Sequence, residues 1–178
     1  MRLLLSAVVV FGALSGLAAP RKSIGDAKEE APCPDVWRDV QLLRALQWAW
    51  APAPIAVRVQ AIEDLGFLQD PRAIDALGAM AFDANQHVAL AAVRAVAAIP
   101  HPRAEEVLGN VLRAPNLSPT LRVRALSLLP FQNTGSALRQ VHAVTHQLGY
   151  PAEVLTTARR LAAQLPNPPH DTFAGETP

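Results

Sequence analysis

Apolar residues along the chain recur in four successive copies of one pattern. In each copy three apolar positions stand four residues apart, which places them on one face of an α-helix. The three columns are Val57, Val88, Leu121 and Val154, then Ala61, Ala92, Ala125 and Ala158, then Leu65, Val96, Leu129 and Ala162. The copies are offset by 31, 33 and 33 residues. A tandem repeat of this length predicts stacked helical units, and the alanine column lets neighbouring helices approach closely.

A second helix is predicted in each unit. Its start reads Asp70-Pro71-Arg72-Ala73 in the first copy and His101-Pro102-Arg103-Ala104 in the second. Proline suits the first helical position, where its missing N–H costs nothing. Proline and glycine divide the later copies into helices of about 118–129, 135–147 and 152–164.

Another helix, over 35–50, is predicted ahead of the repeats. Asp35 can cap it, and its apolar residues recur at three- and four-residue steps. These residues are Val36, Val40, Leu43, Leu46 and Trp50. The helix also holds all three tryptophans, Trp37, Trp48 and Trp50. A bulky cap over the open end of the stack is favoured for them, because terminal repeats must close the core; a ligand-stacking platform is the alternative.

Composition agrees with this picture, since hydrophobic residues make up 51% of the 178 residues and aromatic residues only 5%. Alanine, leucine and valine therefore supply the apolar surface, which favours close-packed helices over strands. The predicted fold class is all-α, an α-solenoid of antiparallel helix pairs with about four units over 35–165.

The two ends of the chain lack this pattern. Residues 1–18 combine Arg2, an apolar run and a final small residue, Ala18, as in a secretory signal peptide cleaved after Ala18. An uncleaved membrane anchor and a buried first helix are the alternatives. We expect a flexible linker over 19–34 and a disordered tail over 166–178. A signal peptide predicts a periplasmic or secreted protein.

Cys33, in the linker, is the only cysteine, which excludes an internal disulfide. In an oxidising compartment its thiol can link two chains into a dimer, and an inert linker thiol is the alternative.

Catalytic motifs are absent from the sequence. It contains no Gly-rich phosphate loop, Gly-x-Ser-x-Gly elbow, His-Glu-x-x-His or paired-cysteine site. His142 and His146 stand four residues apart on a predicted helix, a spacing that suits zinc, but no third ligand can be identified. We therefore expect no catalytic residue, cofactor or metal.

Arginine supplies every positive charge in the repeats, because Lys22 and Lys28 both lie in the linker. The net charge of +1 gives no overall preference for nucleic acid, and we expect no such partner. Candidate partner-binding residues lie on the first helix of each unit. They are Arg58, Arg94, Arg122, Arg124, Arg159 and Arg160. The repeat frame makes Arg58 equivalent to Arg122, and Arg94 to Arg160, so a row of guanidinium groups would suit carboxylates; a solvated helix face is the alternative.

The repeats resemble the HEAT-like repeat family, in the variant named after phycobilisome lyases, whose units read VRxxAxxALGxLxDPRA. Val57-Arg58, Ala61, Leu65-Gly66 and residues 70–74 carry the resemblance, which covers about 54–165. The arginine of the VR pair recurs at Arg122. It is replaced by Ala89 in the second unit and Leu155 in the fourth. The resemblance implies an α-solenoid with the VRxxA helices on its inner face and a ladder of Arg and Asp between units.

Three functions stay open at this point. The repeats favour an exported, non-enzymatic scaffold that binds a protein or an acidic peptide on its inner face. An enzyme similar to the chromophore lyases or to the helical-repeat DNA glycosylases is one alternative, although their substrates are cytoplasmic. A structural envelope component, held through Cys33 or an uncleaved anchor, is the other.

Overall fold

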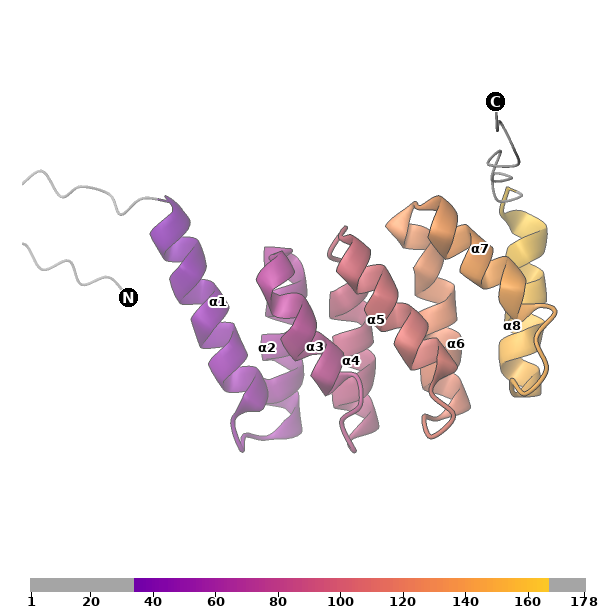
Figure 1. Ribbon diagram of the computed structural model, residues 1–178. Coiled ribbons are helices and arrows are strands. Elements are labelled where there is room, and N and C mark those ends of the chain that lie inside the picture. Colours follow the sequence, from indigo (N-terminus) through magenta and orange to yellow (C-terminus); the bar gives the residue numbers. More distant parts are fainter. Residues whose placement is uncertain (1–33, 167–178) are drawn as a thin grey trace, which may run out of the picture. The chain divides into compact units, whose positions relative to one another are not determined.

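The computed structural model of the chain describes residues 34–166, all of which are helical or lie in the connections between helices (Figure 1). The elements are α1 Pro34–Trp50, α2 Ile55–Leu68, η1 Pro71–Ala73, α3 Ile74–Met80, α4 Gln86–Ala97, α5 Pro102–Arg113, α6 Pro119–Leu128, η2 Leu129–Gln132, α7 Gly135–Val144 and α8 Ala152–Gln164. The predicted signal peptide, linker and tail fall outside the described residues, except that Pro34 begins α1 and Pro166 follows α8.

The helices pack in pairs that form two layers. Figure 1 shows α2, α4, α6 and α8 side by side in one layer, with α3, α5 and α7 in the other and α1 beside α2. Within 34–166 there is no strand. The predicted all-α class and the paired helical packing are therefore confirmed.

The alanine column is buried within the layer formed by α2, α4, α6 and α8. Ala92, Ala125 and Ala158 are fully buried and Ala61 nearly so, as the repeat frame predicts. Gly66 lies at a close approach of α2 and α4, because a Cβ atom added there would lie 3.0 Å from Cα of Ala95. Small residues at these positions thus set the distance between α2 and α4.

Two column positions differ from the prediction. Val57 is exposed, because it lies at the first turn of α2 beside the gap between α1 and α2. Ala162 lies in the last turn of α8 and is only partly buried. The other column residues of these two helices, Ala61, Leu65, Val154 and Ala158, are buried as predicted.

The helix starts follow the predicted proline pattern, but two helices end earlier than predicted. Pro71 and Pro102 occupy the first helical positions, although the helix after Asp70 begins as the 3-10 turn η1. α6 ends at Leu128, where η2 takes over with Pro130 in its first turn. α7 ends at Val144, three residues before the predicted end.

The orientation of α1 corrects the sequence-based interpretation. Its buried residues are Leu42, Ala45 and Ala49, which lie on the side of the helix that packs against α2. The recurring apolar residues that predicted the helix are exposed, apart from the partly buried Leu46, and all three tryptophans are exposed as well. The predicted tryptophan cap over the core is therefore wrong, because alanines allow a closer contact with α2 than tryptophans would.

A buried carboxylate links α5 to α7. Glu105 on α5 accepts hydrogen bonds from the hydroxyl of Thr134 at 2.6 Å, the hydroxyl of Ser136 at 3.0 Å and the amide of Gln140 at 2.9 Å. Thr134 caps α7, and the other two donors lie on it. Glu105 therefore positions α7 on α5, and the three hydrogen bonds stabilise its buried carboxylate. None of the helices in the described part of the chain is long and apolar enough to cross a membrane.

Candidate partner-binding surface

Arg58 is used inside the fold. Its Nε donates a hydrogen bond to the carbonyl oxygen of Ala49, near the end of α1, at 3.0 Å. Its Nη2 lies 2.7 Å from Oδ2 of Asp83, which follows α3. The last carbonyl groups of a helix lack intrahelical partners, so the guanidinium group satisfies one of them and joins α1, α2 and the turn that contains Asp83.

Arg122 repeats this arrangement two units later. Its Nε donates to the carbonyl oxygen of Leu112, near the end of α5, at 2.9 Å. In place of an aspartate, its guanidinium group faces the ring of Tyr150, 4.9 Å from the centroid. The residue is only 5% exposed. Both arginines, named from the sequence as partner-binding residues, instead hold the fold together and do not join an exposed row.

Arg94, in contrast, is exposed on α4. Its Nη2 lies 3.0 Å from Oε1 of Glu63 on α2, one repeat earlier in the same column. A surface ion pair of this kind contributes about 0–1 kcal/mol. Arg94 can therefore exchange Glu63 for a carboxylate of a partner at little cost.

Three hollows lie next to one another along α1 and the layer formed by α2, α4 and α6. A groove of about 760 Å³ lies along the junction of α1 and α2, with Trp48, Val57 and Phe67 in its largely apolar lining. A second hollow, of about 480 Å³, lies between α2 and α4 and contains both Phe67 and Arg94. A third, of about 180 Å³, extends from Arg94 to Arg124 on α6. We call these three hollows the α1–α6 surface.

Phe67 and Arg94 connect the hollows, because Phe67 borders the first and the second, and Arg94 the second and the third. The side chain of Phe67 is 84% exposed. The sequence analysis missed it, although a signal exists. Phe131, which is 75% exposed, occupies the equivalent position two units later. An aromatic residue that recurs outside the core columns indicates a surface role.

The remaining predicted arginines divide into two groups. Arg124 joins Arg94 and His87 around the third hollow. Arg159 and Arg160 are exposed on α8 and border none of the three hollows. The acidic residues of this layer are Glu63 and Asp64 on α2 and Glu153 on α8, whereas exposed arginines lie on α4, α6 and α8, so the layer becomes more positive after α2.

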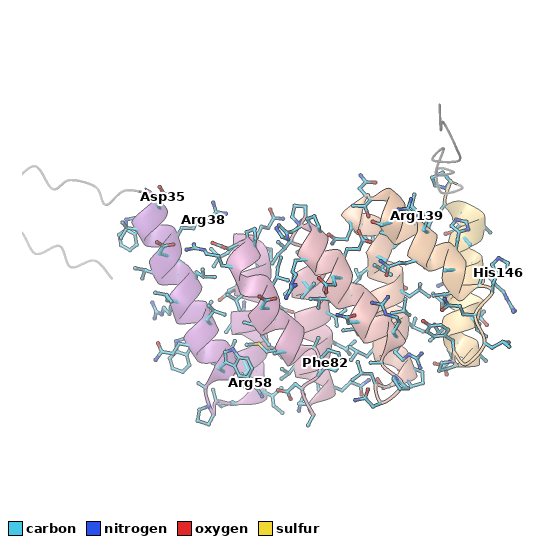
Figure 2. The ribbon with its side chains drawn as sticks, in the orientation of Figure 1. Asp35, Arg38, Arg58, Phe82, Arg139 and His146 are labelled. Atoms are coloured by element: carbon cyan, nitrogen blue, oxygen red, sulfur yellow. The ribbon has the colours of Figure 1, made fainter. Side chains whose placement is uncertain are left out.

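The two histidines do not share a helix. His142 lies on α7, whereas His146 lies two residues beyond its end and extends away from the helices (Figure 2). Among residues 34–166, no three His, Cys, Asp or Glu side chains are grouped so that they could hold a metal ion.

Comparison with known families places HEAT repeats over residues 43–129. This segment runs from α1 to the first residue of η2 and includes Phe67, Arg94 and Arg124. The resemblance to HEAT-like repeats is thereby confirmed for the segment, and the phycobilisome-lyase variant stays a prediction. A search of curated proteins finds no match to the chain.

Proposed function

We propose that the chain is an exported, non-enzymatic scaffold that binds an acidic segment of a partner protein on the α1–α6 surface. HEAT repeat domains are generally protein-binding scaffolds. Export rests on the signal-like layout of residues 1–18.

The observation that carries this proposal is the continuity of the three hollows through Phe67 and Arg94. A protruding phenylalanine can insert into a partner, and the apolar groove beside it can receive an apolar side chain in return. Arg94 and Arg124 then stand where a following acidic residue would lie. A short extended segment with apolar and acidic residues fits this order of contacts.

The charge distribution supports an acidic partner. Arginine binds carboxylates with two parallel hydrogen bonds, and Arg94 already holds the carboxylate of Glu63. Because the exposed charges are screened within about 10 Å at 0.1 M salt, association should weaken as salt is added.

A photo-crosslinking amino acid at position 67 tests the surface directly. The chain carrying it is expressed in its native host, irradiated and purified, and the crosslinked proteins are identified by mass spectrometry. The control carries the crosslinker at Phe82, which is also exposed but lies in the turn after α3. We expect a specific product from position 67 that position 82 does not give. Absence of such a product contradicts the proposal.

Charge reversal tests the role of the arginines. Arg94→Glu combined with Arg124→Glu should abolish the product without lowering the melting temperature. The matched control, Arg113→Glu combined with Arg159→Glu, changes the net charge equally at exposed positions outside the hollows, and should retain the product. If the first variant captures its partner as well as the parent does, this surface is not the binding site.

A further inference from the structure

The side of α1 that faces away from α2 carries an apolar stripe that no other helix in the described part of the chain covers. Val36, Val40, Leu43 and Trp50 are 53%, 49%, 66% and 57% exposed, and the exposed Gln47 completes the series. Their separations of four, three, four and three residues are those of the contact positions in a two-stranded coiled coil. The buried residues Leu42, Ala45 and Ala49 lie on the opposite side of the helix, so α1 is apolar on two sides and only one of them is covered.

The other end of the described stack is closed differently. Exposed residues of α8 are largely polar, namely Glu153, Thr156, Arg159, Arg160 and Gln164. Arg159 occupies the column in which the earlier units have Ile62, Val93 and Leu126, all at most 1% exposed. A charged residue in an otherwise buried column is what a terminal repeat needs to face water. The end formed by α8 is therefore polar, and the end formed by α1 is not.

We propose that the α1 stripe binds the same stripe of a second copy of this chain, with the two α1 helices parallel. Only the α1 end of the described stack is apolar. The polar α8 end therefore offers it no complementary surface. Contact between unlike ends, which would produce open filaments, is thus disfavoured. Contact between two like ends is self-complementary and closes as a symmetric dimer.

The parallel direction follows from the polar residues of the stripe and its edges. A parallel pair brings Gln47 opposite Gln47 of the second copy, where the two amides can bond to each other. It also brings Asp39 toward Arg44 of the second copy, since these residues flank the stripe on opposite sides and are five apart in sequence. Asp39 contacts Arg72 at 2.7 Å, but its side chain is 53% exposed and can accept a second donor.

An antiparallel pair centred on Leu43 lacks these matches. It would place the two Gln47 side chains on opposite sides of the centre, so that the amides could not bond to each other. It would also bring the two Arg44 side chains near each other on the same edge, a repulsion between like charges. Compared with this register, the pattern of α1 favours the parallel direction.

Sedimentation equilibrium of the full chain in the presence of a reductant tests the association without a contribution from Cys33. We expect a dimer for the parent and a monomer for Leu43→Glu, with the helicity of the variant retained and its melting temperature lowered only by the stabilisation that dimerisation gives the parent. Burial of an unpaired carboxylate costs several kcal/mol, so self-association should weaken by about 100-fold or more. Phe131→Glu, at an equally exposed apolar residue outside the stripe, should remain dimeric.

Two results would overturn the proposal. A monomeric parent would mean that the residues ahead of α1, or a different protein, cover the stripe. A dimer that persists in Leu43→Glu would mean that the chains associate elsewhere. Both results would leave the crosslinking experiment at position 67 unaffected, because that experiment concerns the α1–α6 surface.

Cysteine crosslinking tests the direction. In a Cys33→Ser background, Val40→Cys places equal positions in contact only in the parallel pair. Copper phenanthroline serves as the oxidant that takes two electrons as the two thiols release their protons and form the disulfide. We expect rapid crosslinking of Val40→Cys and none of Ala163→Cys, an exposed control position on α8. A dimer in which Val40→Cys does not crosslink would overturn the parallel arrangement.

Discussion

Arg58 and Arg122 occupy the same position two repeats apart, and each donates a hydrogen bond from Nε to a carbonyl oxygen near the end of the preceding helix. In each case the guanidinium group also contacts the connection that leads into the next unit, through Asp83 and Tyr150 respectively. One residue type thus closes a helix end and aligns two successive units. Ala89 and Leu155, which replace this arginine in the other two units, cannot form such bonds.

Replacement of Arg122 by methionine should therefore destabilise the fold. The change keeps the apolar contacts of the side chain and removes the bond to the carbonyl oxygen of Leu112. We expect the free energy of unfolding to fall by about 1.5–3 kcal/mol, the range for hydrogen bonds to charged groups. Arg124→Met, on the exposed side of the same helix, should change it by less than about 0.5 kcal/mol. If urea denaturation shows equal losses of unfolding free energy for the two variants, the structural role of Arg122 is contradicted.

A methyl group at Gly66 should force α2 away from α4. The added Cβ would lie 3.0 Å from Cα of Ala95, a backbone atom that cannot move without its helix. We expect Gly66→Ala to lower the free energy of unfolding by about 1–3 kcal/mol, although alanine is the better helix former by about 1 kcal/mol. Gly78→Ala meets a side-chain methyl of Val107 at 3.2 Å instead and should cost less. A larger loss at Gly78 in thermal denaturation would contradict this reading of the contact.

Enlargement of Ala92 tests the repeat frame at its centre. Ala92 is fully buried between neighbouring helices, so Ala92→Leu should overpack the stack and destabilise it by about 1–3 kcal/mol. Arg103→Ser removes exposed ion pairs with Asp75 and Glu106 and should have little effect. Melting temperatures of the two variants measure the difference, and equal shifts would show that Ala92 is not at a helix crossing.

Acid should weaken the fold through two aspartates. The side-chain hydrogen bond from Arg72 lowers the pKa of Asp70, and the backbone N–H of Asn85, followed by Arg58, lowers the pKa of Asp83. A carboxyl whose pKa is lower in the folded state stabilises the fold above its unfolded pKa, about 3.9, and loses that contribution as pH falls through the folded value. The free energy of unfolding should therefore decrease from about pH 5 downward.

Asp83→Asn provides the check on this pH dependence. The variant should be less stable than the parent at neutral pH and should lose less stability on acidification, because the group that takes up the proton is gone. Urea denaturation at a series of pH values measures both effects. A pH dependence as steep as that of the parent would exclude Asp83 as a contributor.

Export is tested by the intact mass of the protein recovered outside the cytoplasm. Cleavage after Ala18 should give a chain that begins at Ala19. A mass that includes residues 1–18 would indicate an anchor in place of a cleaved signal, and recovery of the protein only from the cytoplasm would contradict export.

The repeat frame allowed much of the fold to be predicted, because apolar spacing reports directly which side of a helix is buried. It placed Ala92 and Ala125 in the core and put Glu63 in the column of Arg94, where the structure has an ion pair. The pattern failed at α1, where both sides are apolar. Periodicity cannot tell which of two apolar sides packs, and the small residues Ala45 and Ala49 decided it.

The candidate surface was less predictable for a different reason. An arginine on a helix suggests exposure, yet Arg122 is buried because a helix end with unpaired carbonyl groups lies beside it. This helix end belongs to α5, so the spacing of residues within α6 cannot reveal it. Phe67 was overlooked because exposed aromatic residues do not follow the core period, and only its recurrence at Phe131 reveals it.

The close packing of helices within the described stack joins elements of the same unit or of adjacent units. Folding of such a chain requires no closure of long loops, so each unit can form on the one made before it. Residues 34–166 should then acquire structure progressively from one end while the remainder of the chain is still extended, as in a protein emerging from a narrow channel. In the native state, amide hydrogen exchange should likewise be fastest in α1 and α8 and slowest in α4, which has neighbours on both sides.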